Sequence, residues 1–162
     1  GLGDVYKRQT MPNPGQVWSY IGGWLYQAHL KEIEDNVPEQ LRSYYNSCAL
    51  RMSIALSSFG KDLKNEAGAE LIGDKANAGA LGGKTHVIIR ARDMAAYVQK
   101  LLGDPDYADG QDTGYCSPQP GDIIVFAGKG HAGMCPGDNI SIGSFLTGPI
   151  WLINRATLKD AE

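Results

Sequence analysis

The spacing of apolar residues changes once along the chain, and this change limits the folds that the sequence can adopt. Within 46–59 and 92–102, apolar side chains recur every three or four positions, as they do on one face of an α-helix. After Pro120-Gly121 the run Asp122–Ala127 is typical of a β-strand, and Gly128-Lys129-Gly130 predicts a hairpin turn. Because helices come first and strands follow, the sequence predicts an α+β fold with N-terminal helices packed on a C-terminal antiparallel sheet.

The first of these helices is predicted to begin at Asn46 or Ser47, which have side chains suited to a helix N-terminus, and to extend through Phe59 to Gly60. One face carries apolar or weakly polar side chains and should be buried. The second helix, over 92–102, is predicted to end at Gly103. The predicted strands are 87–89, 122–127, 131–135, 140–145 and 149–154, with loops or short elements over 65–84.

Composition excludes several classes of protein. Glycine supplies 21 of the 162 residues, well above its average share of about 7%, which disfavours an all-helical bundle. The net charge of −3 argues against a nucleic-acid or anionic-membrane partner, and no apolar run reaches the roughly 18 residues of a membrane helix. We expect one domain over residues 10–162 and no secretory signal peptide. Asp4–Gln9 resembles the translated end of a sequencing-library transposon, so residues 1–9 are expected to lie outside the fold.

Cys48 is the strongest candidate for a functional side chain. It falls in the first turn of a predicted helix, where free backbone N–H groups and the helix dipole favour a thiolate. A thiolate is the reactive form of cysteine, so this position suits a nucleophile. The alternative is that Cys48 is only a small buried residue that packs in the core.

His131 and Asp138 complete a predicted catalytic set. His131 opens the second strand of the predicted hairpin, where an imidazole would be held but accessible, as a general base requires. A cysteine followed by a histidine on the sheet is the order of papain-like hydrolases. Asp138 follows in the next turn and could orient the imidazole, although Asn139 and Asp122 are alternatives and the aspartate also suits a plain turn. His29 and His86 are expected to be surface or structural residues.

The other cysteines leave two further possibilities open. Cys116, His131 and Cys135 could bind zinc with Cys48 as a fourth ligand, but the close C-x-x-C spacing that makes such sites recognisable is missing. Cys116 and Cys135 could instead form a disulfide outside the cytoplasm. We expect no metal and no cofactor.

The run Asn46-Ser47-Cys48-Ala49-Leu50-Arg51-Met52-Ser53 resembles the nucleophile helix of the type VI secretion amidase effectors of family four. The resemblance continues through 87–102, through Gly121–Phe126 to Gly130-His131, and into 150–153, so it covers most of residues 15–155. It implies a papain-like (NlpC/P60-type) α+β fold and a cysteine amidase, with Cys48 as nucleophile, His131 as base and Asp138 as the acidic third residue.

This family also implies a substrate, a partner and a place of action. Its members cut the peptide stem of bacterial peptidoglycan between D-glutamate and meso-diaminopimelate, and a cognate immunity protein blocks them. They are exported without a signal peptide and act in the periplasm of a target bacterium. The alternatives are a papain-like peptidase or acyltransferase with another substrate, an inactive binding module of the same fold, and a zinc-stabilised structural protein.

Overall fold

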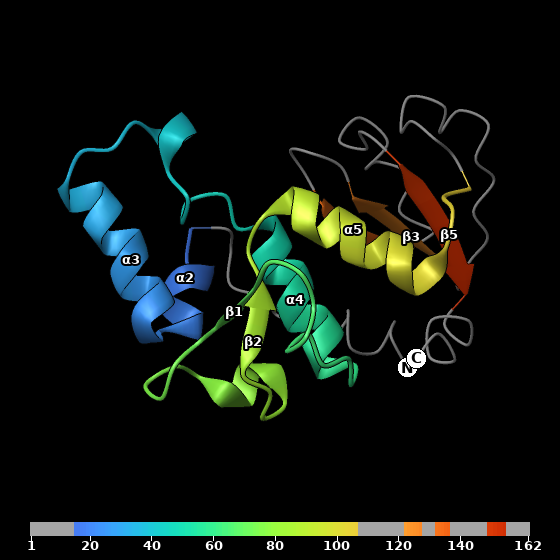
Figure 1. The fold of residues 1–162 in the computed structure, drawn as a ribbon, viewed down its shortest axis with the longest axis horizontal. Coiled ribbons are helices and arrows are strands. Elements are labelled where there is room, and N and C mark those ends of the chain that lie inside the picture. The colour runs from blue at the N-terminus through green and yellow to red at the C-terminus, as the bar shows by residue number, and fades with distance from the viewer. Residues whose placement is uncertain (1–14, 107–121, 128–131, 137–148, 155–162) are drawn as a thin grey trace. The chain divides into compact units, whose positions relative to one another are not determined.

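The computed structural model of the chain describes residues 15–106, 122–127, 132–136 and 149–154 (Figure 1). Residues 1–9, which the sequence places outside the fold, are not among them. The chain divides into two compact units, one formed by Thr10–Arg90 and one that contains Ala91–Glu162.

The N-terminal unit is mostly helical, with one short two-stranded sheet. Strands β1 and β2 are antiparallel, with Glu70 opposite Val87. Strand β2 starts one residue before the predicted strand at 87–89, and β1 falls in the stretch predicted as loop or short elements. The elements in chain order are α2 (Val17–Ile21), α3 (Gly23–Glu34), the 3-10 helix η1 (Glu39–Leu41), α4 (Cys48–Ser58), β1 (Ala69–Leu71), the 3-10 helix η2 (Ala78–Leu81) and β2 (His86–Ile88).

Helix α4 is the centre of this unit and lies beside β2 (Figure 1). The predicted helix is confirmed, with Ser47 at its N-cap and Phe59 at its C-cap. Eight of its eleven residues are buried, so α4 is enclosed on more sides than the single predicted face. One face of α4, with Leu50 and Ile54, joins residues of α2, α3, η2 and β2 in one apolar cluster. This cluster contains Val17, Trp18, Ile21, Leu25, Leu50, Ile54, Ile72, Ala80, Leu81, Val87 and Ile89.

A buried serine joins α4 to β2. The Ser53 hydroxyl accepts a hydrogen bond from the N–H of Ile88 at 2.9 Å. It also lies 2.9 Å from the carbonyl oxygens of Ile88 and Ala49, to which it can donate its single proton. Because Ser53 is fully buried, these bonds replace the water that the strand backbone would otherwise need.

Two glycines form the junction between α2 and α3, with Gly23 as the first residue of α3. Gly22 and Gly23 have φ of 66° and 62°, a left-handed conformation that favours glycine. A Cβ atom on Gly23 would lie 2.5 Å from the carbonyl oxygen of Ile72 and 2.8 Å from the Cβ of Ala76. The absence of a side chain therefore allows the turn and the close approach of the 72–76 backbone.

In its described residues, the C-terminal unit contains one helix and a three-stranded antiparallel sheet. Helix α5 (Ala91–Leu102) ends at Gly103, as predicted, with φ of 80°. It packs beside β3 (Asp122–Ala127) and β4 (Ala132–Pro136) (Figure 1). The strand order is β4-β3-β5, where β5 is Ile150–Asn154, and the indole N–H of Trp151 donates to the carbonyl of Gly103 at 2.8 Å.

These elements confirm much of the predicted organisation. The hairpin pairs Ala127 with Ala132, and β5 pairs with the other edge of β3. The combination of helices with antiparallel sheets is the predicted α+β class. The predicted strand at 140–145 lies outside the described residues. Among the helices that the structure describes, none is long and apolar enough to cross a membrane.

Candidate active site

Cys48 is the first residue of α4, as the sequence predicts. Its side chain is half-buried, and it is not in a disulfide. The backbone N–H of Cys48 donates to the Oδ1 of Asn46 at 3.2 Å, so the Asn46 side chain closes the turn that starts the helix. Ser47 occupies the N-cap position but makes no side-chain capping bond. The thiol thus lies at the positive end of a well-packed helix, which stabilises a thiolate.

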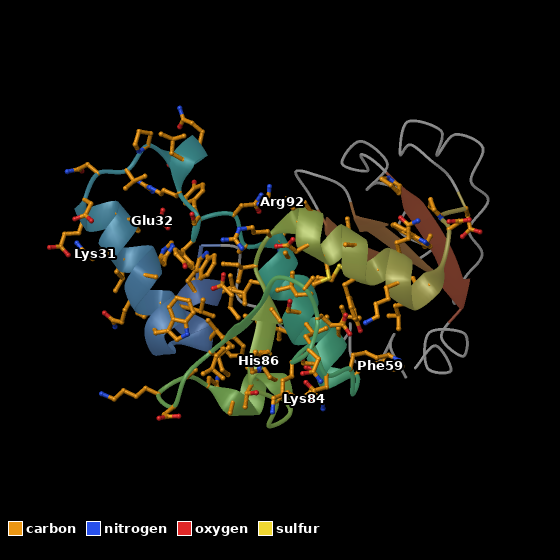
Figure 2. All side chains as sticks on the ribbon, in the orientation of Figure 1. Lys31, Glu32, Phe59, Lys84, His86 and Arg92 are labelled. Atoms are coloured by element: carbon orange, nitrogen blue, oxygen red, sulfur yellow. The ribbon has the colours of Figure 1, made fainter. Side chains whose placement is uncertain are left out.

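The segment that leads into Cys48 is held by a carboxylate of α3. Glu32 accepts hydrogen bonds from the backbone N–H groups of Ser43 and Tyr44, at 2.8 and 2.7 Å. Figure 2 shows Glu32 on the side of α3 that is turned toward this segment, with Lys31 beside it. Charge-assisted bonds of this kind are stronger than neutral ones, so α3 fixes the path of the chain four residues before the thiol.

Two aromatic rings hold the same segment from the side of α2 and α3. The Nδ1–H of His29 donates to the carbonyl of Tyr44, and the indole N–H of Trp18 donates to the carbonyl of Tyr45 at 3.1 Å. The His29 and Trp18 rings are stacked, with centroids 5.5 Å apart. Together with Glu32, these side chains satisfy four backbone groups just before α4.

The Tyr44 side chain packs between two indole rings. It meets Trp18 and Trp24 edge to face, at centroid distances of 6.1 and 5.8 Å. Burial, and to a smaller extent the negative charge of Glu70, raises the pKa of the Tyr44 phenol above its ordinary value. The phenol is therefore neutral at physiological pH.

A pocket of about 630 Å³ opens beside this segment. Its lining carries one aromatic side, formed by Trp18 and Tyr45, and three ionisable side chains, which are His29, Glu39 and Arg42. Asn46 and Ser47, the two residues before the thiol, also line it. The pocket therefore reaches the residues that immediately precede the candidate nucleophile.

Of the residues predicted to act with Cys48, His131 and Asp138 lie outside the described residues. His131 directly precedes β4, which confirms the strand but leaves the side chain as a prediction. Asn139, one alternative to Asp138, also lies outside the described residues. Asp122, the other alternative, is the first residue of β3. The catalytic set of Cys48, His131 and Asp138 thus stays a prediction.

The zinc site and the disulfide predicted as alternatives for the other two cysteines stay predictions. Cys116 lies outside the described ranges, and Cys135 belongs to β4. Within the part of the chain that the structure describes, no group of three or more His, Cys, Asp or Glu side chains could hold a metal ion.

The two remaining histidines have structural contacts. His29 is engaged as above, and the Nδ1 of His86 forms a 2.8 Å hydrogen bond with the hydroxyl of Thr85. The expectation that both are surface or structural residues agrees with these contacts, although His29 also lines the pocket. Sequence reasoning missed the positioning roles of Trp18, His29 and Glu32. The spacing of three between His29 and Glu32, which places them on one face of α3, was the available signal.

Comparison with known proteins identifies the family. The model of the family "Type VI secretion system (T6SS), amidase effector protein 4", Tae4, matches residues 44–140, which include Cys48 and His131. None of the curated proteins searched matches the chain.

Solved structures show a similar fold. Tae4 from Enterobacter cloacae is 20% identical, with a TM-score of 0.60, and the match covers 95% of this chain and 96% of that one. The Tae4–Tai4 effector–immunity complex from the same organism gives 19% identity and a TM-score of 0.59, covering 95% and 98%. Tae4 from Salmonella typhimurium, in complex with Tai4 from Enterobacter cloacae, gives 18% and 0.57, covering 94% and 98%. Because the family match spans more than half of the sequence, the chain belongs to the Tae4 family of type VI secretion amidase effectors, which are secreted hydrolases.

Proposed function

We propose that this amidase is a cysteine hydrolase of papain-like (NlpC/P60-type) fold that cuts the D-glutamyl–meso-diaminopimelate bond in the peptide stem of peptidoglycan. The observation that carries the proposal is the position of Cys48. It is a half-buried thiol at the first residue of α4, inside the segment that matches the Tae4 family. We further propose that residues 10–162 act as one amidase domain, because the solved Tae4 structures cover 95% of the chain.

The proposed reaction has two steps. His131 takes the proton of the Cys48 thiol, and the thiolate attacks the carbonyl carbon of the D-glutamyl side chain. A tetrahedral oxyanion forms, the C–N bond breaks, and His131 returns the proton to the leaving amine. Water then attacks the thioester, again with His131 as base, and releases the free carboxylate and the thiol. Asp138 orients the imidazole in both steps.

The backbone N–H of Cys48 is our candidate donor to the oxyanion, because it lies at the start of the helix. In the free protein it donates to Asn46. The oxyanion therefore has to replace the Asn46 oxygen as acceptor, so Asn46 is exchanged for substrate at the moment of attack. No cofactor takes part in this scheme.

The biological setting follows from the family. We propose that the chain is exported by a type VI secretion system, acts on peptidoglycan in the periplasm of a target bacterium, and is blocked by a cognate immunity protein. The effector–immunity complexes of Tae4 with Tai4 support this partner.

The test is hydrolysis of muropeptides that contain diaminopimelate, followed by mass spectrometry of the products. The wild type should release two fragments divided at the D-glutamyl–diaminopimelate bond. Cys48→Ala should lose at least about a thousandfold in turnover, because losing a covalent nucleophile costs several orders of magnitude.

Circular dichroism should show that Cys48→Ala keeps its fold, since alanine suits the first turn of a helix. Cys135→Ser is the matched control and should keep its activity. Cleavage at another bond, transfer to an added amine, or no turnover at all would favour the peptidase, acyltransferase or inactive-module alternatives.

A further inference from the structure

From the pocket beside the nucleophile segment we infer a subsite for a zwitterionic amino-acid end. We propose that Arg42 binds the free carboxylate, and Glu39 the free ammonium group, at the far end of the diaminopimelyl residue of the stem peptide. This inference rests on the proposed function, because it names the part of the same substrate that enters this pocket.

Arg42 is held in place but has no ion-pair partner among the described residues. Its Nε donates to the carbonyl of Val37 at 2.7 Å, and its guanidinium carbon lies 5.5 Å from the centre of the Tyr45 ring. Both contacts fix the guanidinium in place, yet neither supplies a negative charge. Among the ion pairs of the described residues none involves Arg42, although its side chain is partly buried. A guanidinium that is held in this way is preorganised for a carboxylate.

The pocket is lined by one positively charged side chain, Arg42, and one negatively charged side chain, Glu39. Glu39 is exposed and lines the same pocket as Arg42, three residues away along the chain, without forming an ion pair with it in the described structure. A ligand with one negative group alone would meet Glu39 unfavourably, whereas a zwitterion satisfies both side chains. The free end of diaminopimelate carries one ammonium and one carboxylate on the same carbon.

The pocket lies next to the residues that precede Cys48. Asn46 and Ser47 line the pocket and directly precede Cys48, and Asn46 also accepts the hydrogen bond of the Cys48 N–H. A group bound here therefore lies next to the turn that carries the nucleophile. The volume of about 630 Å³ is within the usual range of ligand sites, and the exposed Tyr45 ring provides an aromatic surface for the methylene chain.

The experiment couples changes in the protein to changes in the substrate. Three muropeptides are compared: one with the free diaminopimelate end, one with that carboxylate converted to an amide, and one with that amine acetylated. For the wild type, each modification should lower kcat/KM about tenfold to a hundredfold, because a charged hydrogen bond is lost.

Arg42→Gln should have the same kcat/KM on the unmodified muropeptide as the wild type has on the amidated one. Amidation of the substrate should lower the kcat/KM of this variant no further. Glu39→Gln should behave in the same way toward the acetylated amine. Lys31→Gln is the matched control, because Lys31 is an exposed cation of α3 paired with Asp35, and it should retain both losses of the wild type.

Binding separates the subsite from the chemistry. In the Cys48→Ala background, calorimetry with the free muropeptide should show that Arg42→Gln and Glu39→Gln weaken Kd by about the same factors. If Arg42→Gln remains as sensitive to amidation as the wild type, the subsite is refuted. If Arg42→Gln removes the sensitivity to amidation but Glu39→Gln leaves the sensitivity to acetylation unchanged, the zwitterion is refuted in favour of a plain carboxylate site. If the wild type cleaves none of the three muropeptides, and Cys48→Ala binds none of them, the proposed function fails together with the subsite.

Discussion

Two serines one turn apart on α4 show how far the surroundings of a single hydroxyl determine its effect. Ser53 and Ser57 are both buried, with 0% and 2% of their surface exposed. Ser53 satisfies the backbone of Ile88, whereas the Ser57 hydroxyl has no hydrogen-bond partner in the part of the chain that the structure describes. The same atom is therefore a necessary contact at one position and an uncompensated cost at the other.

We expect Ser53→Ala to lower the free energy of unfolding by about 1–3 kcal/mol, because it leaves two backbone groups of Ile88 buried without a partner. Ser57→Ala should be neutral or stabilising by up to about 1 kcal/mol, since it removes an unsatisfied hydroxyl and raises helix propensity. Urea unfolding of both variants measures the difference, and equal destabilisation by the two changes would contradict it.

The third member of the predicted catalytic set is also tested at single residues. If Asp138 orients His131, Asp138→Asn should lower kcat steeply with little change in KM, because an amide favours the wrong imidazole tautomer. The free energy of unfolding should change by about 1 kcal/mol or less. If Asn139→Ala lowers kcat and Asp138→Asn leaves it unchanged, the orienting group is the amide of Asn139. If neither change lowers kcat, Cys48 and His131 act as a dyad.

Among the elements, those with a strong local pattern are the ones that the sequence predicts well. Helices α4 and α5 and the β3–β4 hairpin follow from apolar spacing and from the glycines at their ends. Strand β1 and the docking of α3 were not predictable in this way, since both depend on distant residues. The Glu32 carboxylate meets backbone groups eleven and twelve residues away, and the Trp24 indole donates to the carbonyl of Leu71. Such contacts leave no periodic pattern.

In the candidate site, too, the features set by local sequence were predictable and those set by distant contacts were not. Cys48 could be predicted as a candidate, and as the first residue of a helix, because both follow from a short motif at a helix start. The pocket was not found, because its lining comes from α2, α3, η1 and the segment before α4, which only the fold brings together. Arg42 and Glu39 belong to no sequence motif that would mark them as a site.

The junction between α2 and α3 supports a test at the scale of elements. Gly23→Ala should destabilise the protein by about 2–4 kcal/mol, because the added Cβ is strained by the positive φ and overlaps the 72–76 backbone. Gly83→Ala is the matched control. It shares a positive φ of 86° but meets nothing within 4 Å, so it should cost only about 1–2 kcal/mol. Thermal or urea unfolding compares the two, and equal costs would show that the close approach to Ile72 is unimportant.

The stability of the whole molecule should depend on alkaline pH through Tyr44. Because its pKa is raised in the folded state, the unfolded chain loses this proton first, at a pH near 10. The stabilisation is therefore complete below about pH 10 and is lost as the pH rises through the folded-state pKa. Tyr44→Phe should show a shallower decline in the free energy of unfolding above pH 10, measured by urea unfolding. An identical decline in both proteins would contradict a role for Tyr44.

The hydrogen bonds that Glu32 accepts from the backbone should also slow the hydrogen exchange of two amides. The N–H groups of Ser43 and Tyr44 are sheltered by one side chain of α3 rather than by a helix or sheet of their own. Their protons exchange with deuterium when these hydrogen bonds open, so their exchange rates report on the opening of the contacts that hold the segment before Cys48. Two amide signals in a spectrum would thus follow the opening of the segment before Cys48, with no substrate present.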